Sequence, residues 1–428
     1  MKLLIKNGEL VNPLGVSGKY DILVEEEKIS KIEENIKEEE GMQVIDATGL
    51  TVMPGLIDMH VHLREPGFEY KEDIESGTRA CAAGGMTAVV CMPNTKPVLD
   101  NAPLMDYIYN RAKECGYCKV YPTGCISKGM LGQELSEMGD MHEHGAVAFT
   151  DDGRPVMNSN LMRNAMEYAK NFDSILISHC EDLDLVDEGV MNEGFTSTVL
   201  GLKGNTRVAE ENHVSREILL ASALNTKVHI AHVSTKGGVE IIRHAKKLGI
   251  RVSAETAPHY FACTDEWVKG YNTYAKVNPP LRTEEDRLAI IEGLKDGTLD
   301  CIITDHAPHH EDEKNVEFPL AMNGISGIET SFGVTNTYLV KTGEMTMEQV
   351  VRAMSCNPAR ILKLEGGVLE EGKTADITIV DENKKWTVEK DKLKSKGKNC
   401  IFDGVELIGK PCYTIVDGKV VLDNYNRR

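Results

Sequence analysis

The sequence predicts an α/β protein: a TIM-like (β/α)₈ barrel with a small β-sandwich domain formed from both termini. Three observations predict this fold. Eight short apolar runs lie between residues 56 and 309, with helical segments between several of them. Both ends of the chain are instead rich in short strands and turns. A length of 428 residues fits one barrel of about 250 residues plus a smaller domain.

Residues 1–55 are expected to form the N-terminal part of the small β domain. Residues 3–6 and 9–11 read as strands, and Asn7-Gly8 between them has the form of a type I′ hairpin turn. We therefore predict that these two strands pair with each other.

Residues 56–364 are expected to form the barrel. The expected strands cover residues 56–62, 87–92, 119–123, 146–150, 174–178, 227–232, 251–256 and 301–304. The expected helices cover residues 102–115, 160–169, 208–224, 237–247 and 284–294, where apolar residues recur at helical spacing. Repeated strand–helix alternation indicates a (β/α)₈ barrel, and active sites of this fold lie at the C-terminal ends of the strands.

The end of the chain returns to β structure. A last helix is expected near residues 347–364, and Pro358 should kink or restart it. Residues 365–428 are then expected to form the C-terminal part of the small β domain. They contain a strand at 375–380 and a second hairpin pattern around Asp417-Gly418.

Composition excludes several classes of partner. The chain has 48 Lys and Arg against 67 Asp and Glu, a formal net charge of −19, which disfavours nucleic acid and anionic membranes. No uncharged apolar stretch approaches the roughly 20 residues of a membrane helix, and the first apolar run is too short for a signal peptide. The 11 cysteines are an odd, scattered set, which argues against a disulfide framework. We expect a cytoplasmic protein.

The first predicted barrel strand ends in two histidines. Side chains alternate along a strand, so His60 and His62 point the same way. Two such imidazoles can hold a divalent cation, and zinc is the usual occupant of nitrogen-rich sites. Alone, the pair is equally well explained as the polar end of a strand exposed to water.

Residues of metal-binding type also end four later strands. They are Asp151 and Asp152 after strand four, His179 after strand five, His232 after strand six and Asp305 after strand eight. Four histidines and two aspartates can hold two cations bridged by one carboxylate, with a water of lowered pKa between them. Alternation does not choose between Asp151 and Asp152. His229 and His232 should face opposite sides of their strand, so that both cannot be ligands.

Four motifs stand at these strand ends. They are His60-Val61-His62-Leu63-Arg64-Glu65-Pro66-Gly67, Ser178-His179-Cys180-Glu181-Asp182, Glu255-Thr256-Ala257-Pro258-His259-Tyr260 and Asp305-His306-Ala307-Pro308-His309. Together they resemble the type I (class I) dihydroorotases of the amidohydrolase superfamily. The likeness covers nearly the whole chain, including the split β domain, and the first and last motifs are highly specific.

The resemblance implies two zinc ions per subunit. It implies that His60, His62 and Asp305 bind one zinc and that His179 and His232 bind the other. Hydantoinases and dihydropyrimidinases place a carboxylated lysine at the bridge, on strand four, where this chain offers only aspartates. Alignment with the family favours Asp152 as the bridge, because it lies the same distance before His179 as in relatives.

The resemblance also implies the substrate contacts. Arg64 and Asn94 match residues that grip the substrate α-carboxylate, and a guanidinium can bind a carboxylate with two hydrogen bonds. The other matching positions are His62, Asn278, His309, Asn323 and Gly324, although relatives often have phenylalanine at position 323. The polar stretch 311–323 is expected to be a mobile loop over the site.

The implied reaction is the reversible cyclisation of N-carbamoyl-L-aspartate to L-dihydroorotate plus water in de novo pyrimidine (UMP) biosynthesis. A bridging hydroxide would be the nucleophile, and Asp305 the general acid and base. A hydantoinase, dihydropyrimidinase or allantoinase is the main rival, which Arg64 and the missing lysine disfavour. An inactive scaffold subunit for aspartate transcarbamoylase would typically lose ligands that this chain keeps. The sequence leaves open a homodimer and an association with aspartate transcarbamoylase.

Overall fold

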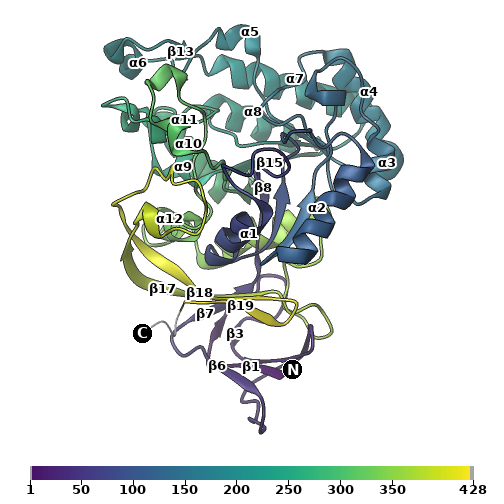
Figure 1. Cartoon of the computed structure of the whole chain (residues 1–428), viewed down its shortest axis with the longest axis vertical. Helices are drawn as coiled ribbons and strands as arrows, with labels where there is room; N and C mark the ends of the chain where they lie inside the picture. Colours follow the sequence, from purple (N-terminus) through teal and green to yellow (C-terminus); the bar gives the residue numbers. More distant parts are fainter. Residues whose placement is uncertain (1, 425–428) are drawn as a thin grey trace.

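A computed structural model describes residues 2–424 of the chain, and Figure 1 shows a mixed α/β molecule. The helices and parallel strands of the middle of the chain fill the upper part of this view. Strands from the two ends of the chain lie together below them. The α/β class that the sequence predicts is therefore confirmed.

Seven of the eight predicted barrel strands are present, and all their pairings are parallel. They are β8 (Leu56–Val61), β9 (Met86–Cys91), β10 (Lys119–Pro122), β11 (Leu176–Ser178), β14 (Val228–Ile230), β15 (Val252–Thr256) and β16 (Cys301–Ile302). They form one sheet in the order β10-β9-β8 and another in the order β11-β14-β15-β16. Most of their residues are buried, as expected for parallel strands that are covered on both faces.

The prediction of a fourth strand at residues 146–150 is wrong in its extent. Only Phe149 forms strand bridges there, to Gly124 and Leu176, although Val147 and Thr150 also donate backbone hydrogen bonds to Pro122 and Gly124. A further parallel bridge joins Val61 to His306. Isolated bridges therefore link the two parallel sheets at both of their edges.

The five predicted helices are confirmed within one residue. They are α2 (Ala102–Cys115), α4 (Ser159–Ala169), α7 (Val208–Leu224), α8 (Lys236–Lys247) and α10 (Glu284–Lys295). Local sequence explains their starts: Thr283, for example, accepts a hydrogen bond from the backbone of Asp286, and the Asp286 side chain accepts one in return. The other α-helices are α1 (Ile74–Ala83), α3 (Met138–Glu143), α5 (Leu183–Val186), α6 (Phe195–Leu200), α9 (Pro258–Ala262), α11 (Glu311–Lys314) and α12 (Ser331–Thr335).

The last helical segment is interrupted as Pro358 predicts. Helix α13 (Met347–Val351) passes through a π-helical turn at Arg352–Cys356 and restarts as α14 (Asn357–Leu362), with Pro358 in its first turn. Another π turn covers Asn336–Val340. The 3₁₀ turns are Lys128–Met130, Lys170–Phe172, Asp265–Val268, Thr273–Ala275, Phe318–Leu320 and Lys390–Lys392.

Two further sheets combine strands from the ends of the chain. One has the order β5-β4-β1-β6, from β1 (Lys2–Lys6), β4 (Asp21–Glu25), β5 (Lys28–Glu33) and β6 (Gln43–Asp46). The other has the order β19-β18-β17-β7-β2-β3, from β2 (Glu9–Leu10), β3 (Gly18–Lys19), β7 (Thr51–Pro54), β17 (Ile377–Thr387), β18 (Glu406–Val416) and β19 (Lys419–Asp423). A short pair, β12 (Met191–Asn192) and β13 (Gly204–Asn205), lies elsewhere.

One hairpin prediction is wrong and the other is confirmed. Strands β1 and β2 do not pair, because β1 lies between β4 and β6 while β2 pairs with β3 and β7. The chain thus uses Asn7-Gly8 to cross from one sheet to the other. Asp417-Gly418, by contrast, joins the antiparallel strands β18 and β19, and both turn residues have positive φ.

The sheets formed by the two ends of the chain connect directly to β8, the strand that contains His60. Strand β7 pairs with β17 and is followed after one residue, Gly55, by β8. The Gly55 N–H donates to the backbone oxygen of Asp376 at 2.9 Å. Within residues 2–424, none of the helices combines the length and apolarity that crossing a bilayer requires.

Candidate metal centre

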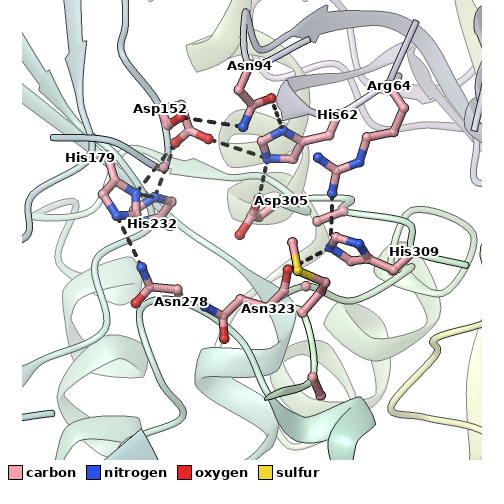
Figure 2. A pocket seen from close by; sticks show the side chains of 15 residues that line it. His62, Arg64, Asn94, Asp152, His179, His232, Asn278, Asp305, His309 and Asn323 are labelled. Carbon is pink, nitrogen blue, oxygen red and sulfur yellow. Dashed lines mark hydrogen bonds and ion pairs between the residues drawn. The ribbon is translucent and has the colours of Figure 1, made fainter. Parts of the chain in front are cut away.

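The C-terminal ends of the parallel strands surround a cavity of about 270 Å³. Figure 2 shows side chains that point into it from several elements. Eleven of the twelve site residues predicted from the sequence line it, and the twelfth, His60, does not line it but lies 3.3 Å from Asp152. The eleven are His62, Arg64, Asn94, Asp152, His179, His232, Asn278, Asp305, His309, Asn323 and Gly324.

His60 and His62, at and just after the end of β8, face Asp305 together. His62 Nε2 lies 3.0 Å from Oδ1 of Asp305, and His60 Nε2 lies 3.7 Å from the same oxygen. All three residues are buried, and their donor atoms lie within 4.8 Å of one another. The two imidazoles share one side of the strand, as alternation predicts, and the group could hold one metal ion.

Asp152 faces the four histidines His60, His62, His179 and His232, of which Figure 2 shows the last three. Its Oδ1 lies 3.3 Å from His60 Nε2. The same oxygen lies 3.6 Å from His179 Nδ1 and 3.6 Å from His232 Nε2. Its Oδ2 lies 3.5 Å from His62 Nε2. One carboxylate thus stands between two histidine pairs, which is where an oxygen ligand shared by two cations would have to lie.

Asp151 has different surroundings, although it precedes Asp152 directly. Its carboxylate accepts hydrogen bonds from the backbone N–H groups of Ile126 and Ser127, at 2.8 Å and 3.1 Å, and from the Ser127 hydroxyl. Burial raises the pKa of Asp151 to about 6, although these hydrogen bonds oppose the rise. Asp151 therefore fixes a neighbouring loop, while Asp152 faces the histidines.

The residues present fit a metal ion. Within residues 2–424, His60 Nε2 and Asp152 Oδ1 are buried without a partner in hydrogen-bonding geometry. Such atoms are costly to bury unless something satisfies them. Imidazole nitrogens and carboxylate oxygens are the donor types that zinc accepts. A cation between them would therefore satisfy both atoms with suitable chemistry.

The electrostatics of the cluster also favour bound positive charge. Burial opposes the charging of His60 and His179, but the Asp152 carboxylate raises the pKa of His60 well above its usual range and that of His179 to about 10. Burial likewise opposes ionisation of Asp305, yet the hydrogen bond with His62 helps lower its pKa to about 2. The cluster thus attracts protons that a bound metal would displace.

Glu255 and His229 support the cluster and were not predicted from the sequence. Glu255 Oε1 lies 2.6 Å from His60 Nδ1, and its Oε2 lies 3.0 Å from His229 Nε2. A carboxylate at the far nitrogen of a histidine fixes which nitrogen faces the metal side. The signal in the sequence that could have indicated Glu255 was the presence of a charged residue within the buried strand β15.

Three site residues other than glycine have positive φ, namely Arg64 at 64°, His232 at 31° and Asp305 at 47°. In residues other than glycine this conformation costs about 1–2 kcal/mol, and it persists where the surroundings impose it. The chain has left the strand at these positions. His232 therefore lies beyond the end of β14 and reaches the cluster, whereas His229 remains in the strand and contacts Glu255.

Arg64 brings a buried guanidinium to the cavity (Figure 2). Its Nε donates to the backbone oxygen of Pro308 at 3.1 Å, and one Nη lies 3.3 Å from His309 Nε2. Burial lowers the pKa of Arg64 to about 10, so its charge is retained at neutral pH. Asn94 contributes an amide nearby, with its Oδ1 2.9 Å from His62 Nδ1.

Asn278 lies on the opposite side of the cavity, beside His179. Its Nδ2 donates to Glu181 Oε2 at 3.0 Å and lies 3.4 Å from His179 Nε2. Glu181 Oε2 also lies 3.4 Å from His179 Nε2. Glu181 is therefore a second carboxylate beside a predicted metal ligand, and no role for it was predicted from the sequence.

Asn323 and Gly324 form the edge of the cavity through backbone groups. The Asn323 backbone oxygen lies 2.8 Å from His309 Nε2. Gly324 has a φ of +142°, and an added Cβ would meet the Cβ and the backbone oxygen of Ala307 at 2.7 Å. The Gly324 N–H donates to the Lys276 oxygen at 2.9 Å. Gly324 therefore permits close approach, while its own N–H is already used.

Comparisons with known proteins agree with the motifs. Residues 49–238 match a family model described as Dihydro-orotase-like, and residues 305–422 match one described as Amidohydrolase family. The dihydroorotase of Ruminiclostridium cellulolyticum is 55% identical over 423 residues, which cover 99% of each chain. That of Acetivibrio thermocellus is also 55% identical, over 98% of this chain and 99% of the relative.

Solved structures with a similar fold carry other names. The L-hydantoinase (dihydropyrimidinase) from Arthrobacter aurescens has a TM-score of 0.89 and 26% identity, covering 98% of this chain and 96% of that one. The dihydropyrimidinase from Brevibacillus agri has a TM-score of 0.86 at 22% identity, covering 99% and 95%. The second likeness concerns the fold alone. The fold is thus similar to that of hydantoinases, whereas the full-length sequence relatives are dihydroorotases.

Proposed function

The chain belongs to the dihydroorotase family, and from this premise we propose that its histidine–aspartate cluster interconverts N-carbamoyl-L-aspartate and L-dihydroorotate. The observation that carries the proposal is the position of Asp152. Where hydantoinases are expected to have a carboxylated lysine, this chain has an aspartate that faces four histidines. A buried arginine beside the same cavity suits a substrate with a free carboxylate.

We propose that the cluster holds two zinc ions. His60, His62 and Asp305 would bind one, His179 and His232 would bind the other, and Asp152 would bridge them. Bound there, the zinc ions would polarise the carbonyl under attack and lower the pKa of a bound water. Glu255 would keep His60 in the tautomer that directs its Nε2 to the metal.

The substrate carboxylate would lie against Arg64. The chain as a whole has a net charge of −19, so an anionic substrate needs a local positive group at the site. Arg64 provides it from the side of the cavity away from His179, and Asn94 and His309 would add neutral hydrogen bonds. This placement would leave the ring amide of the substrate toward Asp152 and Asp305.

Asp305 would carry the proton during the reaction. Its carboxylate borders the cavity, is ionised because its pKa is lowered to about 2, and lies 3.0 Å from His62 Nε2. In the hydrolytic direction it would accept the proton released as water adds to the ring carbonyl. It would then deliver that proton to the departing ring nitrogen. In the biosynthetic direction it would take the proton from the ureido nitrogen.

We propose that the parallel strands form the closed (β/α)₈ barrel of the superfamily, over residues 56–364. The bridges at Phe149 and at Val61–His306 support closure, because they connect the two parallel sheets at both edges. We further propose that residues 1–55 and 365–428 form one β-sandwich domain. Its support is the pairing of β7 with β17, which joins the two ends of the chain.

One assay tests the proposed function. Purified protein would be analysed for bound metal and assayed for hydrolysis of L-dihydroorotate, with and without a chelator, beside dihydrouracil, hydantoin and allantoin. We expect about two zinc ions per chain, dihydroorotate as the preferred substrate, and loss of activity with the chelator that added Zn²⁺ restores. Preference for hydantoin or dihydrouracil would refute the proposal.

We also propose that the enzyme is cytoplasmic, which its 11 unpaired cysteines favour. Homodimerisation and association with aspartate transcarbamoylase remain predictions. Size-exclusion chromatography of the purified protein, alone and mixed with the transcarbamoylase, would test both.

A further inference from the structure

The two ring nitrogens of His309 have different partners. Nε2 lies 2.8 Å from the backbone oxygen of Asn323. A carbonyl oxygen only accepts hydrogen bonds, so this short contact places the proton on Nε2, and the longer contact of 3.3 Å between Nε2 and an Arg64 Nη joins two donors. Burial, followed by the positive charges of Arg64 and Lys71, lowers the pKa of His309, and the ring is therefore neutral with a single proton. Its other nitrogen, Nδ1, must then accept a hydrogen bond.

Lys71 supplies the donor for that nitrogen. Lys71 Nζ lies 3.3 Å from His309 Nδ1, and only 6% of Lys71 is exposed. Glu313 Oε2 also lies 3.4 Å from Nδ1, but a carboxylate brings no proton to a neutral acceptor nitrogen. The same Glu313 lies 2.7 Å from Lys71 Nζ through its other oxygen. Glu313 therefore holds the ammonium group in place, and the ammonium group is the donor.

These residues come from three separate segments. Lys71 lies between β8 and α1, His309 follows β16, and Glu313 is in α11. The Tyr70 hydroxyl donates to Glu313 Oε1 at 3.1 Å, which adds a second link between the first and third segments. The proton on His309 is thus set by a contact that reaches across the edge of the cavity.

We propose that Lys71 is a positioning residue that fixes His309 as the Nε2–H tautomer, so that this proton is directed at the carboxylate of the bound substrate. In the structure the Asn323 oxygen accepts this proton, and the Arg64 guanidinium, a second donor, lies 3.3 Å from the same nitrogen. The proposal rests on the proposed function only for the identity of the acceptor. The position of the proton on the His309 ring does not depend on which substrate binds.

The first test is the protonation of the His309 ring. The ring nitrogen shifts of protein labelled with ¹⁵N-histidine would be recorded for the wild type, Lys71→Met and Lys71→Arg, with His309→Gln to assign the signals. We expect a protonated Nε2 and an acceptor Nδ1 in the wild type, loss of the Nδ1 hydrogen-bond shift in Lys71→Met, and its return in Lys71→Arg. Lys396→Met is the matched control, because Lys396 and Lys71 both line a second cavity beside the site, but Lys396 pairs with Asp73.

The second test is kinetic. Partners that orient a functional group from behind typically contribute 10- to 100-fold, so we expect the KM for L-dihydroorotate to rise about tenfold in Lys71→Met with kcat nearly unchanged. Lys71→Arg should recover most of this loss, and Lys396→Met should match the wild type.

Two results would overturn the inference. One is a proton on Nδ1 of His309 in the wild type, a measurement that needs no variant to fold. The other is an unchanged ring spectrum and KM in Lys71→Met. If the wild type hydrolysed no dihydroorotate, the proposed function would fail, but the nitrogen shifts would still decide the role of Lys71.

Discussion

Asp151 and Asp152 show how much chemistry depends on a single residue position. Both carboxylates are buried, but one accepts from backbone N–H groups and the other faces four imidazoles. Alternation along a strand could not separate them, because the strand is reduced to one bridged residue before they begin. Their roles can be compared with the same substitution at each position.

We predict that Asp152→Asn loses bound metal and that Asp151→Asn keeps it. Asparagine removes the charge at both sites, but at position 151 its oxygen can still accept from Ile126 and Ser127. Elemental analysis of both proteins after dialysis would measure the difference. We expect Asp152→Asn to lose more affinity than the roughly 10- to 100-fold typical of residues that only support ligands. Equal metal content in the two variants would contradict the bridging role of Asp152.

Asp305→Asn should fold but lose turnover by about two to four orders of magnitude, because an amide cannot accept and return a proton. Circular dichroism and the thermal midpoint would confirm folding, and L-dihydroorotate hydrolysis would measure the loss. Metal content must be determined in the same sample, since Asp305 is also a proposed ligand. Near-normal turnover would exclude Asp305 as the proton carrier.

The sequence identified the residues that line the cavity better than the residues that support them. His60, His62 and Asp305 lie at or just after the ends of strands and belong to specific motifs, so their type and position both indicated a function. Glu255 is 195 positions away from His60, and no local pattern predicts that they touch. Lys71 was missed for the same reason, because its role exists only through His309 and Glu313.

At the scale of elements, the segment 311–324 depends on one buried lysine. Lys314 is 2% exposed, and its Nζ donates to the backbone oxygens of Met322 at 2.6 Å and Gly324 at 3.1 Å. From the sequence, residues 311–323 are expected only to form a mobile polar loop over the site. Its composition gave no sign that one of its charges turns inward to hold the cavity edge.

We predict that Lys314→Met lowers the free energy of unfolding by about 1–3 kcal/mol, because a buried carbonyl group loses its donor. The KM for dihydroorotate should also rise, because Asn323 and Gly324 border the cavity. Urea denaturation and limited proteolysis would measure the two effects on stability and on the loop. Lys392→Met is a suitable control, since Lys392 is exposed and pairs with Glu389 at the surface. An unchanged protease pattern would count against the anchoring role.

Elements were predicted well where their signal was local. The long helices match because apolar spacing and capping residues are contained within each segment. The hairpin expected at Asn7-Gly8 does not form. Strand β1 pairs with β4 and β6 and strand β2 pairs with β7, and a local turn signal does not reveal these competing partners. At Asp417-Gly418 the same signal succeeds, since β19 is an edge strand that, within residues 2–424, pairs with β18 alone.

At the scale of the whole molecule, the end of the chain takes part in the site. The Asn399 Oδ1 accepts from the backbone N–H of His309 at 3.0 Å, and its Nδ2 donates to the Gly324 oxygen at 2.9 Å. The same region supplies β17 and β18, whose buried residues Ile377 and Ile415 pack with Val52. A segment that begins after residue 364 therefore supports both the β sheets and the edge of the cavity.

A chain ending at residue 364 should consequently fail to form a native protein. It would lose β17, the partner of β7, and would expose apolar side chains next to the strand that leads into β8. It would also leave the backbone N–H of His309 without its acceptor. We expect insoluble material or, in any soluble fraction, no cooperative thermal transition and no near-ultraviolet circular dichroism. A soluble truncated protein that melted cooperatively and hydrolysed dihydroorotate would show that the central residues fold and act without the C-terminal segment.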